Sequence, residues 1–85
     1  MEEEIIEAVN PKISDLNMHV DKVYLEEVDG ITNLNVVLDS DEVIDLDRIT
    51  LASNIINPII DKMNIDLDNY VLDIHSKESG DDYDE

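Results

Sequence analysis

Apolar residues near the start of the chain recur at intervals of three and four, the spacing of one face of an α-helix. This stripe consists of Ile5, Ile6, Val9, Ile13 and Leu16. It predicts a first helix over residues 2–16. The acidic residues of the first turn suit the positive end of a helix dipole, which supports a helix start at this point.

Pro11 lies inside this predicted helix. Proline has no N–H to donate to the carbonyl of Glu7, and its ring clashes with the preceding turn. A kink or a restart after Asn10 is therefore expected, with the Asn10 side chain capping the second segment.

The next part of the chain predicts a β-hairpin. Residues 18–28 are rich in Val, Tyr and Leu, Asp29-Gly30 is a turn signal, and residues 31–38 resume a strand-like pattern. In the second arm, one apolar row should face the core, because Leu34, Val36 and Leu38 alternate with Asn33, Asn35, Val37 and Asp39.

A second helical stripe follows a polar connection and predicts a helix over residues 46–63. Its members are Ile49, Ala52, Ile56, Ile59, Ile60 and Met63. Asp45 is the expected N-cap, and Asp47 lies favourably in the first turn. Asn57-Pro58 predicts a kink in the preceding turn.

A third strand is predicted over residues 70–75, with Leu72 and Ile74 inward and Asp73 facing solvent. In the link before it, Ile65 and Leu67 are candidates to pack beneath the domain. The element order is thus α-β-β-α-β, which places the chain in the α+β class.

The organisation of the chain follows from the same patterns. Residues 1–75 should form one domain, which is what a length of 85 residues permits. Residues 76–85 have no apolar period and predict a mobile acidic tail.

The net charge of −18 comes from 23 acidic and five scattered basic residues. Because nucleic acids and anionic membranes are bound through clustered Lys and Arg, this distribution argues against direct binding to either. A field of this sign attracts basic proteins, although solubility alone is the simpler interpretation. The lack of cysteine, an acidic start and the absence of a long apolar run favour a cytoplasmic protein without signal peptide or membrane span.

Candidate sites for metals are weak. Asp39-Ser40-Asp41 resembles the start of a calcium loop, but Ile44 and Thr50 occupy the positions that require glycine and an acidic residue. The pair formed by Asp66 and Asp68 fails in the same way. Both segments are therefore expected to be polar connections between secondary-structure elements.

Candidate catalytic residues are equally weak. His19 and His75 have no ligand or acid–base partner at helical spacing and are expected on strand surfaces, although a pairing across the sheet stays open. Ser53 lies in a predicted helix and not at a strand-to-helix elbow. With two glycines, the chain has no phosphate-binding loop. We therefore expect no enzymatic activity, no metal and no cofactor.

An ordered set of residues resembles the N-terminal domain of the ribosome maturation factor RimP family. The set comprises Pro11, Asp39, Asp45-Leu46-Asp47, Thr50 to Ser53, Asp61 and Leu72-Asp73. The resemblance extends from the first helix to Ile74 and implies a two-layer sandwich with two helices on one face of a three-stranded sheet.

The resemblance also implies a function. Members of this bacterial, cytoplasmic and non-catalytic family assist maturation of the small ribosomal subunit and engage a strongly basic ribosomal protein. Two features depart from the family: Ser76-Lys77-Glu78 replaces Ser-Pro-Gly, and the sequence has no counterpart of the second, barrel domain. A naturally short protein, an isolated domain and a diverged relative with another partner are all compatible with these departures.

The resulting hypothesis is a ribosome-assembly factor domain that binds the small subunit or one of its basic proteins through Asp45, Asp47 and Asp73. The alternative is an acidic protein-interaction module or nucleic-acid mimic that occupies a basic protein. A cation-dependent switch is a third alternative. The sequence does not indicate strand order or oligomeric state.

Overall fold

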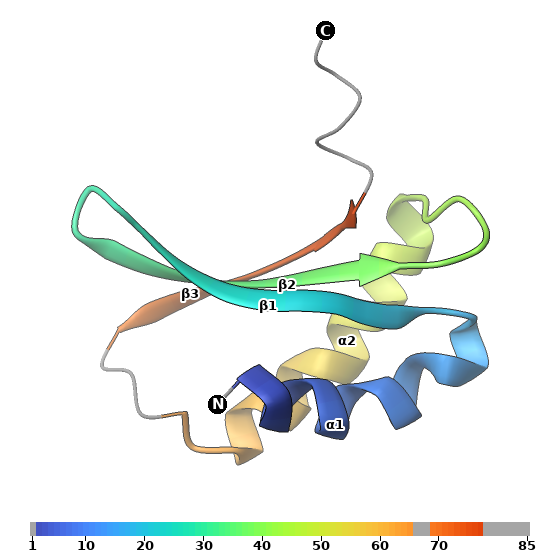
Figure 1. Ribbon diagram of the computed structural model, residues 1–85, viewed down its shortest axis with the longest axis horizontal. Coiled ribbons are helices and arrows are strands. Elements are labelled where there is room, and N and C mark those ends of the chain that lie inside the picture. Colours follow the sequence, from blue (N-terminus) through green and yellow to red (C-terminus); the bar gives the residue numbers. More distant parts are fainter. Residues whose placement is uncertain (1, 66–68, 78–85) are drawn as a thin grey trace, which may run out of the picture.

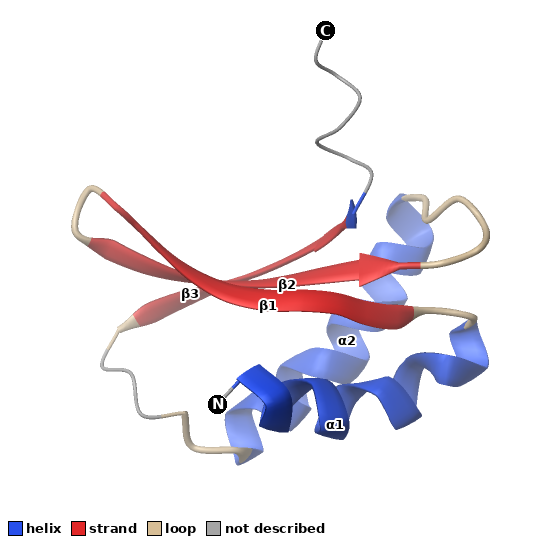
Figure 2. Cartoon of the chain, in the orientation of Figure 1, coloured by secondary structure: helices blue, strands red, loops and turns tan. Residues whose placement is uncertain are grey.

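The computed structural model describes residues 2–65 and 69–77, which form two layers (Figures 1 and 2). The elements in chain order are helix α1 (Glu2–Ile13), the 3₁₀ turn η1 (Ser14–Leu16), strands β1 (His19–Val28) and β2 (Ile31–Asp39), helix α2 (Leu46–Lys62) and strand β3 (Tyr70–Ser76). Both helices lie on one side of the sheet, so the predicted α+β sandwich of order α-β-β-α-β is confirmed.

The sheet has the order β1-β2-β3, with β2 in the centre. β1 and β2 are antiparallel and closed by a two-residue turn, in which Asp29 and Gly30 have φ of 53° and 79°. Positive φ at both central residues fits the twist of a hairpin, and Asp-Gly tolerates it. β3 runs parallel to β2. A parallel neighbour needs a long crossover, and α2 lies within that connection.

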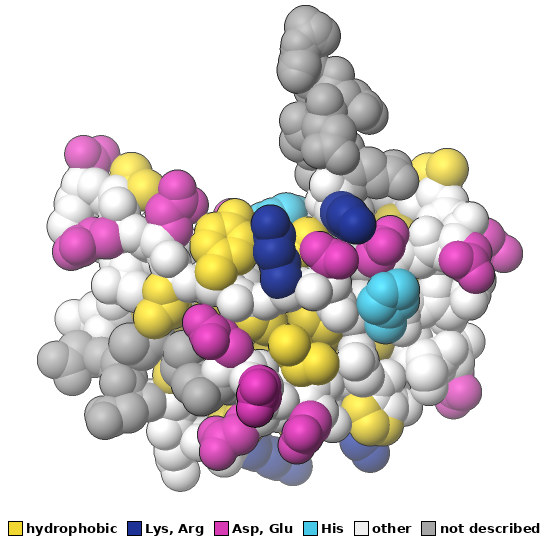
Figure 3. Space-filling model, in the orientation of Figure 1, with side chains coloured by type: hydrophobic (Ala, Val, Ile, Leu, Met, Phe, Trp, Pro, Cys, Tyr) yellow, Lys and Arg dark blue, Asp and Glu magenta, His cyan; other side chains and the backbone are white. Residues whose placement is uncertain are grey.

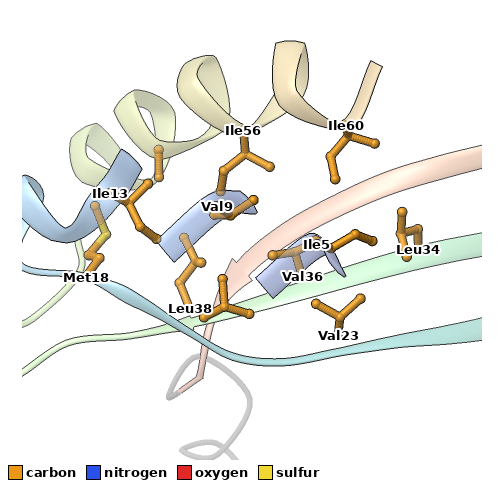
Figure 4. Close-up of a cluster of buried hydrophobic side chains, with 12 residues drawn as sticks. Ile5, Val9, Ile13, Met18, Val23, Leu34, Val36, Leu38, Ile56 and Ile60 are labelled. Atoms are coloured by element: carbon orange, nitrogen blue, oxygen red, sulfur yellow. The ribbon is translucent and has the colours of Figure 1, made fainter. Parts of the chain in front are cut away.

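The core lies between the sheet and the helices (Figure 4). Each helix contributes a row spaced by four residues: Ile5, Val9 and Ile13 from α1, and Ala52, Ile56 and Ile60 from α2. The central strand supplies the predicted row of Leu34, Val36 and Leu38, all fully buried. Leu72, Ile74 and Ile65 pack against this cluster. The predicted core faces of both helices and of β2 are therefore correct.

The predicted restart of the first helix is wrong. α1 continues through Pro11 and ends at Ile13, with a 3₁₀ turn in place of the expected last residues. The Asn10 side chain does not cap a helix, because its Oδ1 accepts a hydrogen bond from the Val20 N–H at 2.7 Å. The Asn10 side chain therefore links α1 to β1, whereas the local sequence had predicted that it would cap a helix.

The helix-free face of the sheet is more enclosed than simple alternation predicts. Val37 and Asn35 point away from the helices, yet each is 3% exposed. Their neighbours in register explain this: Lys22 and His75 flank Val37, while Tyr24 and Asp73 flank Asn35. Side chains on both outer strands therefore flank the central strand, and the long ones of Lys22 and Tyr24 extend over it.

Two predicted features, the polar link before β3 and the acidic tail, include residues whose structure is not described. Asp66, Leu67 and Asp68 lie outside the described residues, as do residues 78–85 of the predicted acidic tail. The described part of the chain continues through Ser76, the last residue of β3, to Lys77.

Candidate protein-interaction surfaces

Asp45 and Asp47 lie at the start of α2, as predicted. Asp45 is the N-cap, with extended backbone and a side-chain Oδ1 that accepts a hydrogen bond from the Arg48 N–H at 2.9 Å. Ile44 and Ile49 flank the cap and both pack on the core, in the positions of a hydrophobic staple. Asp45 and Asp47 are exposed. The start of α2 is thus fixed locally and presents carboxylates to solvent.

Arg48 ties this helix start to the rest of the domain. Its guanidinium donates hydrogen bonds to the Val43 carbonyl at 2.9 Å and to the Leu16 carbonyl, and it lies 3.7 Å from a Glu42 carboxylate oxygen. The Arg48 side chain is only 21% exposed. The hydrophobic pattern of the sequence does not single out Arg48, although it is the sole arginine of the chain and stands three positions after the cap.

Ser40 fixes the other end of the same connection. Its hydroxyl donates to the Asn17 carbonyl at 2.6 Å and accepts from the Glu42 N–H at 3.1 Å. Its own N–H donates to Asp39 Oδ1 at 2.8 Å. The segment between β2 and α2 is therefore held at both ends by side-chain hydrogen bonds.

The same segment exposes large apolar side chains. Val43 is 75% and Leu46 is 78% exposed, whereas Ile31, the next most exposed large apolar residue of the described chain, is at 52%. We call the following set the β2–α2 surface: Asp41, Glu42, Val43, Asp45, Leu46 and Asp47, all exposed. Figure 3 shows apolar and acidic side chains over this connection, at the right of the view.

Asp73, the third predicted site residue, lies elsewhere. It stands on β3 in register with Asn35, on the helix-free face of the sheet, and its Oδ1 is 3.5 Å from His75 Nδ1. Since Asp45 and Asp47 belong to the helical layer, the fold brings those two residues together but places Asp73 on a different surface.

Asp73 shares this face with other charged side chains, a grouping that the sequence did not predict. We call these residues the open sheet face: His19, Asp21, Lys22, Asp39, Asp73, His75 and Lys77. Lys77 Nζ lies 3.6 Å from Asp21 and 3.9 Å from Asp39, and His19 lies 4.0 Å from Asp39. Figure 3 shows basic, acidic and histidine side chains side by side above the strands.

Each histidine contacts an aspartate on this face, and neither contact joins the two histidines. Within residues 2–65 and 69–77, no group of three or more His, Cys, Asp or Glu side chains has the arrangement of a metal site. No helix in the same part of the chain is long and apolar enough to cross a bilayer. The contacts observed on the two surfaces are ion pairs and hydrogen bonds.

Comparison with known proteins identifies the family of this chain. No curated protein matches the chain. A family model described as the RimP N-terminal domain matches residues 8–77, a span that begins in α1 and ends just after β3. It includes every strand, the whole of α2 and all three predicted site residues. The chain therefore belongs to the RimP N-terminal domain family, a family of ribosome maturation factors.

Proposed function

We propose that this domain is a non-catalytic, cytoplasmic ribosome-assembly module that binds a basic protein of the small ribosomal subunit. Family membership supports the ribosomal context. The observation that carries the binding mode is the β2–α2 surface, where Asp41, Glu42, Asp45 and Asp47 are exposed around the start of α2.

Charge supports a basic partner. The chain carries a net charge of −18, so approach of a cationic protein is accelerated at low ionic strength and wrong, acidic partners are repelled. At the β2–α2 surface the neighbouring cation, Arg48, is largely buried and bound to backbone carbonyls. Glu42 lies 3.7 Å from the Arg48 guanidinium but its side chain is 70% exposed. The exposed carboxylates of Asp41 and Asp47 are available to cations from outside.

Asp73 is proposed as a second, weaker contact. On the open sheet face, Lys22 and Lys77 offset part of the acidic charge, and Asp73 already lies beside His75. A partner that uses Asp73 together with Asp45 must therefore reach around the domain from one layer to the other.

The test is retention of purified small subunits, and separately of their basic proteins, on the immobilised full chain at low and moderate salt. Asp41→Asn/Asp45→Asn/Asp47→Asn should reduce retention strongly, because asparagine still caps α2 while three charges are lost. Glu2→Gln/Glu3→Gln/Glu4→Gln is the matched control, since it removes three exposed charges from α1.

Three results would contradict this function. The wild-type chain could retain no small-subunit component even at low salt, or the α2-start variant and the α1 control could lose retention equally. The third is capture of a nucleic-acid-binding protein outside the ribosome from which DNA or RNA displaces the chain, which identifies a nucleic-acid mimic instead.

A further inference from the structure

The two most exposed large apolar side chains of the described chain flank the α2 cap. Val43 precedes Asp45 by two residues and Leu46 follows it directly, and they are 75% and 78% exposed. Leu51, five residues after Leu46 on α2, is also half exposed at 51%. These side chains add nothing to the core, although aliphatic groups of this size each stabilise a folded or bound state when buried.

The backbone that presents them is already ordered. Arg48 donates to the Val43 carbonyl, the Asp45 carboxylate accepts from the Arg48 N–H, and Ser40 links the segment to Asn17. A binding surface held in one conformation loses little entropy on complex formation, so more of its contact energy appears as affinity.

The surroundings of the two apolar side chains are acidic. Asp41 and Glu42 precede Val43, and Asp45 and Asp47 enclose Leu46 in the sequence. An apolar partner surface without cations would leave these carboxylates desolvated and unpaired, which is costly. A purely cationic partner would leave Val43 and Leu46 in water.

From this combination we infer that the β2–α2 surface binds a cationic protein segment through an aliphatic or aromatic side chain flanked by Lys or Arg. Val43 and Leu46 contact the apolar side chain, while the carboxylates of Asp41, Glu42 and Asp47 pair with its basic neighbours. The inference rests on the proposed function and specifies which part of a basic ribosomal protein is recognised.

The experiment measures binding of two fluorescent peptides to the full chain by anisotropy. One peptide contains arginines and leucines, and in the other serines replace the leucines at equal charge. The wild-type chain should bind the leucine peptide at least about tenfold more tightly, the difference expected when one or two aliphatic side chains are buried.

The variants locate this preference. Val43→Thr/Leu46→Gln removes apolar surface without changing charge, and it should bind both peptides with the weaker affinity. Val28→Thr/Ile31→Thr is the matched control, because this pair is 49% and 52% exposed at the hairpin tip, the other end of β2. It should keep the wild-type preference. Circular dichroism checks that both variants are folded.

Equal binding of the two peptides by the wild-type chain would overturn the inference, as would an unchanged preference in Val43→Thr/Leu46→Gln. Retention of small-subunit proteins separates this result from the proposed function. If the wild-type chain and Val43→Thr/Leu46→Gln retain them equally, the inference fails and the function stands. In the opposite case, the wild type prefers the leucine peptide through Val43 and Leu46 but retains no small-subunit protein. That result would reject the proposed ribosomal function and keep the inferred recognition of a cationic segment with an apolar side chain.

Discussion

The open sheet face and the β2–α2 surface both carry carboxylates, but they differ in how those carboxylates are used. On the open sheet face, Lys77 lies between Asp21 and Asp39, and His75 lies beside Asp73. On the β2–α2 surface, Arg48 donates to two backbone carbonyls and lies 3.7 Å from the largely exposed Glu42 carboxylate, while Asp41 and Asp47 are exposed. Charge that is paired within the domain contributes little to recognition, whereas exposed charge beside apolar groups is available to a partner.

The largest expected effect concerns Arg48. Arg48→Ala should lower the free energy of unfolding by about 2–3 kcal/mol, because a charged donor to two carbonyls is lost and the part-buried Leu16 carbonyl loses its partner. Urea denaturation followed by circular dichroism measures the change. Arg48→Lys keeps the charge but not the two-pronged geometry, so its stability should lie between those of the wild type and Arg48→Ala. A stability loss below about 0.5 kcal/mol for Arg48→Ala would contradict the stabilising role of the hydrogen bond between α2 and η1.

The next largest effect is a difference in stability between alanine variants of two valines, one buried and one exposed. Val37→Ala on the sheet should cost about 2 kcal/mol, since its side chain is 3% exposed and the substitution removes buried methyl groups. Val43→Ala should change stability by less than about 0.5 kcal/mol, because Val43 is 75% exposed. Thermal and urea unfolding of both variants test the difference. Similar losses in the two would mean that Val43 is also covered.

A smaller effect on stability is expected at the start of α2, where two substitutions of Asp45 distinguish helix capping from charge. Asp45→Ala should destabilise the domain by about 1 kcal/mol through loss of the bond to the Arg48 N–H, while Asp45→Asn should stay close to wild type. Asp47→Asn should cost a few tenths of a kcal/mol from the helix dipole. Denaturation midpoints give all three values. If Asp45→Asn is as unstable as Asp45→Ala, the carboxylate acts by charge and not as a cap.

The smallest effect is expected on the open sheet face. Lys77→Ala should lower stability by less than about 1 kcal/mol, because Lys77 is 52% exposed and surface ion pairs are weak. The loss should shrink further in high salt, which screens exposed charges. Unfolding at two salt concentrations tests this, with Lys12→Ala on α1 as a control for removing one exposed lysine. A large loss that is independent of salt would show that Lys77 acts through packing.

Much of the fold was predictable because its determinants are local. The spacing of Ile5, Val9 and Ile13, and the alternation of Leu34, Val36 and Leu38, assign both an element and its buried face. The Asp45 cap depends on residues three positions apart, so it too is visible in the sequence. Asn10 shows the limit: its local environment suggested a helix cap, but a strand ten residues away competes for the same oxygen.

The candidate site was predictable only in part. Asp45 and Asp47 are two positions apart in the sequence and stay together at the start of α2, whereas Asp73 lies on β3, on the helix-free face of the sheet. Leu46 lies outside the apolar stripe of α2, and this position on the helix is a sequence signal that its side chain is exposed. Arg48 and Lys77 were not identified from the sequence, because the Leu16 carbonyl that Arg48 contacts and the Asp21 and Asp39 carboxylates near Lys77 are distant from them in the chain.

By itself, the sequence determined the element order, the core faces, the hairpin turn and the acidic character of the domain, since each depends on periodicity or composition within a short segment. The tertiary structure decided the strand order, the coverage of Val37 and Asn35, and which carboxylates lie beside a basic side chain of the domain. Those properties depend on which distant groups come within a few ångströms of one another when the chain folds.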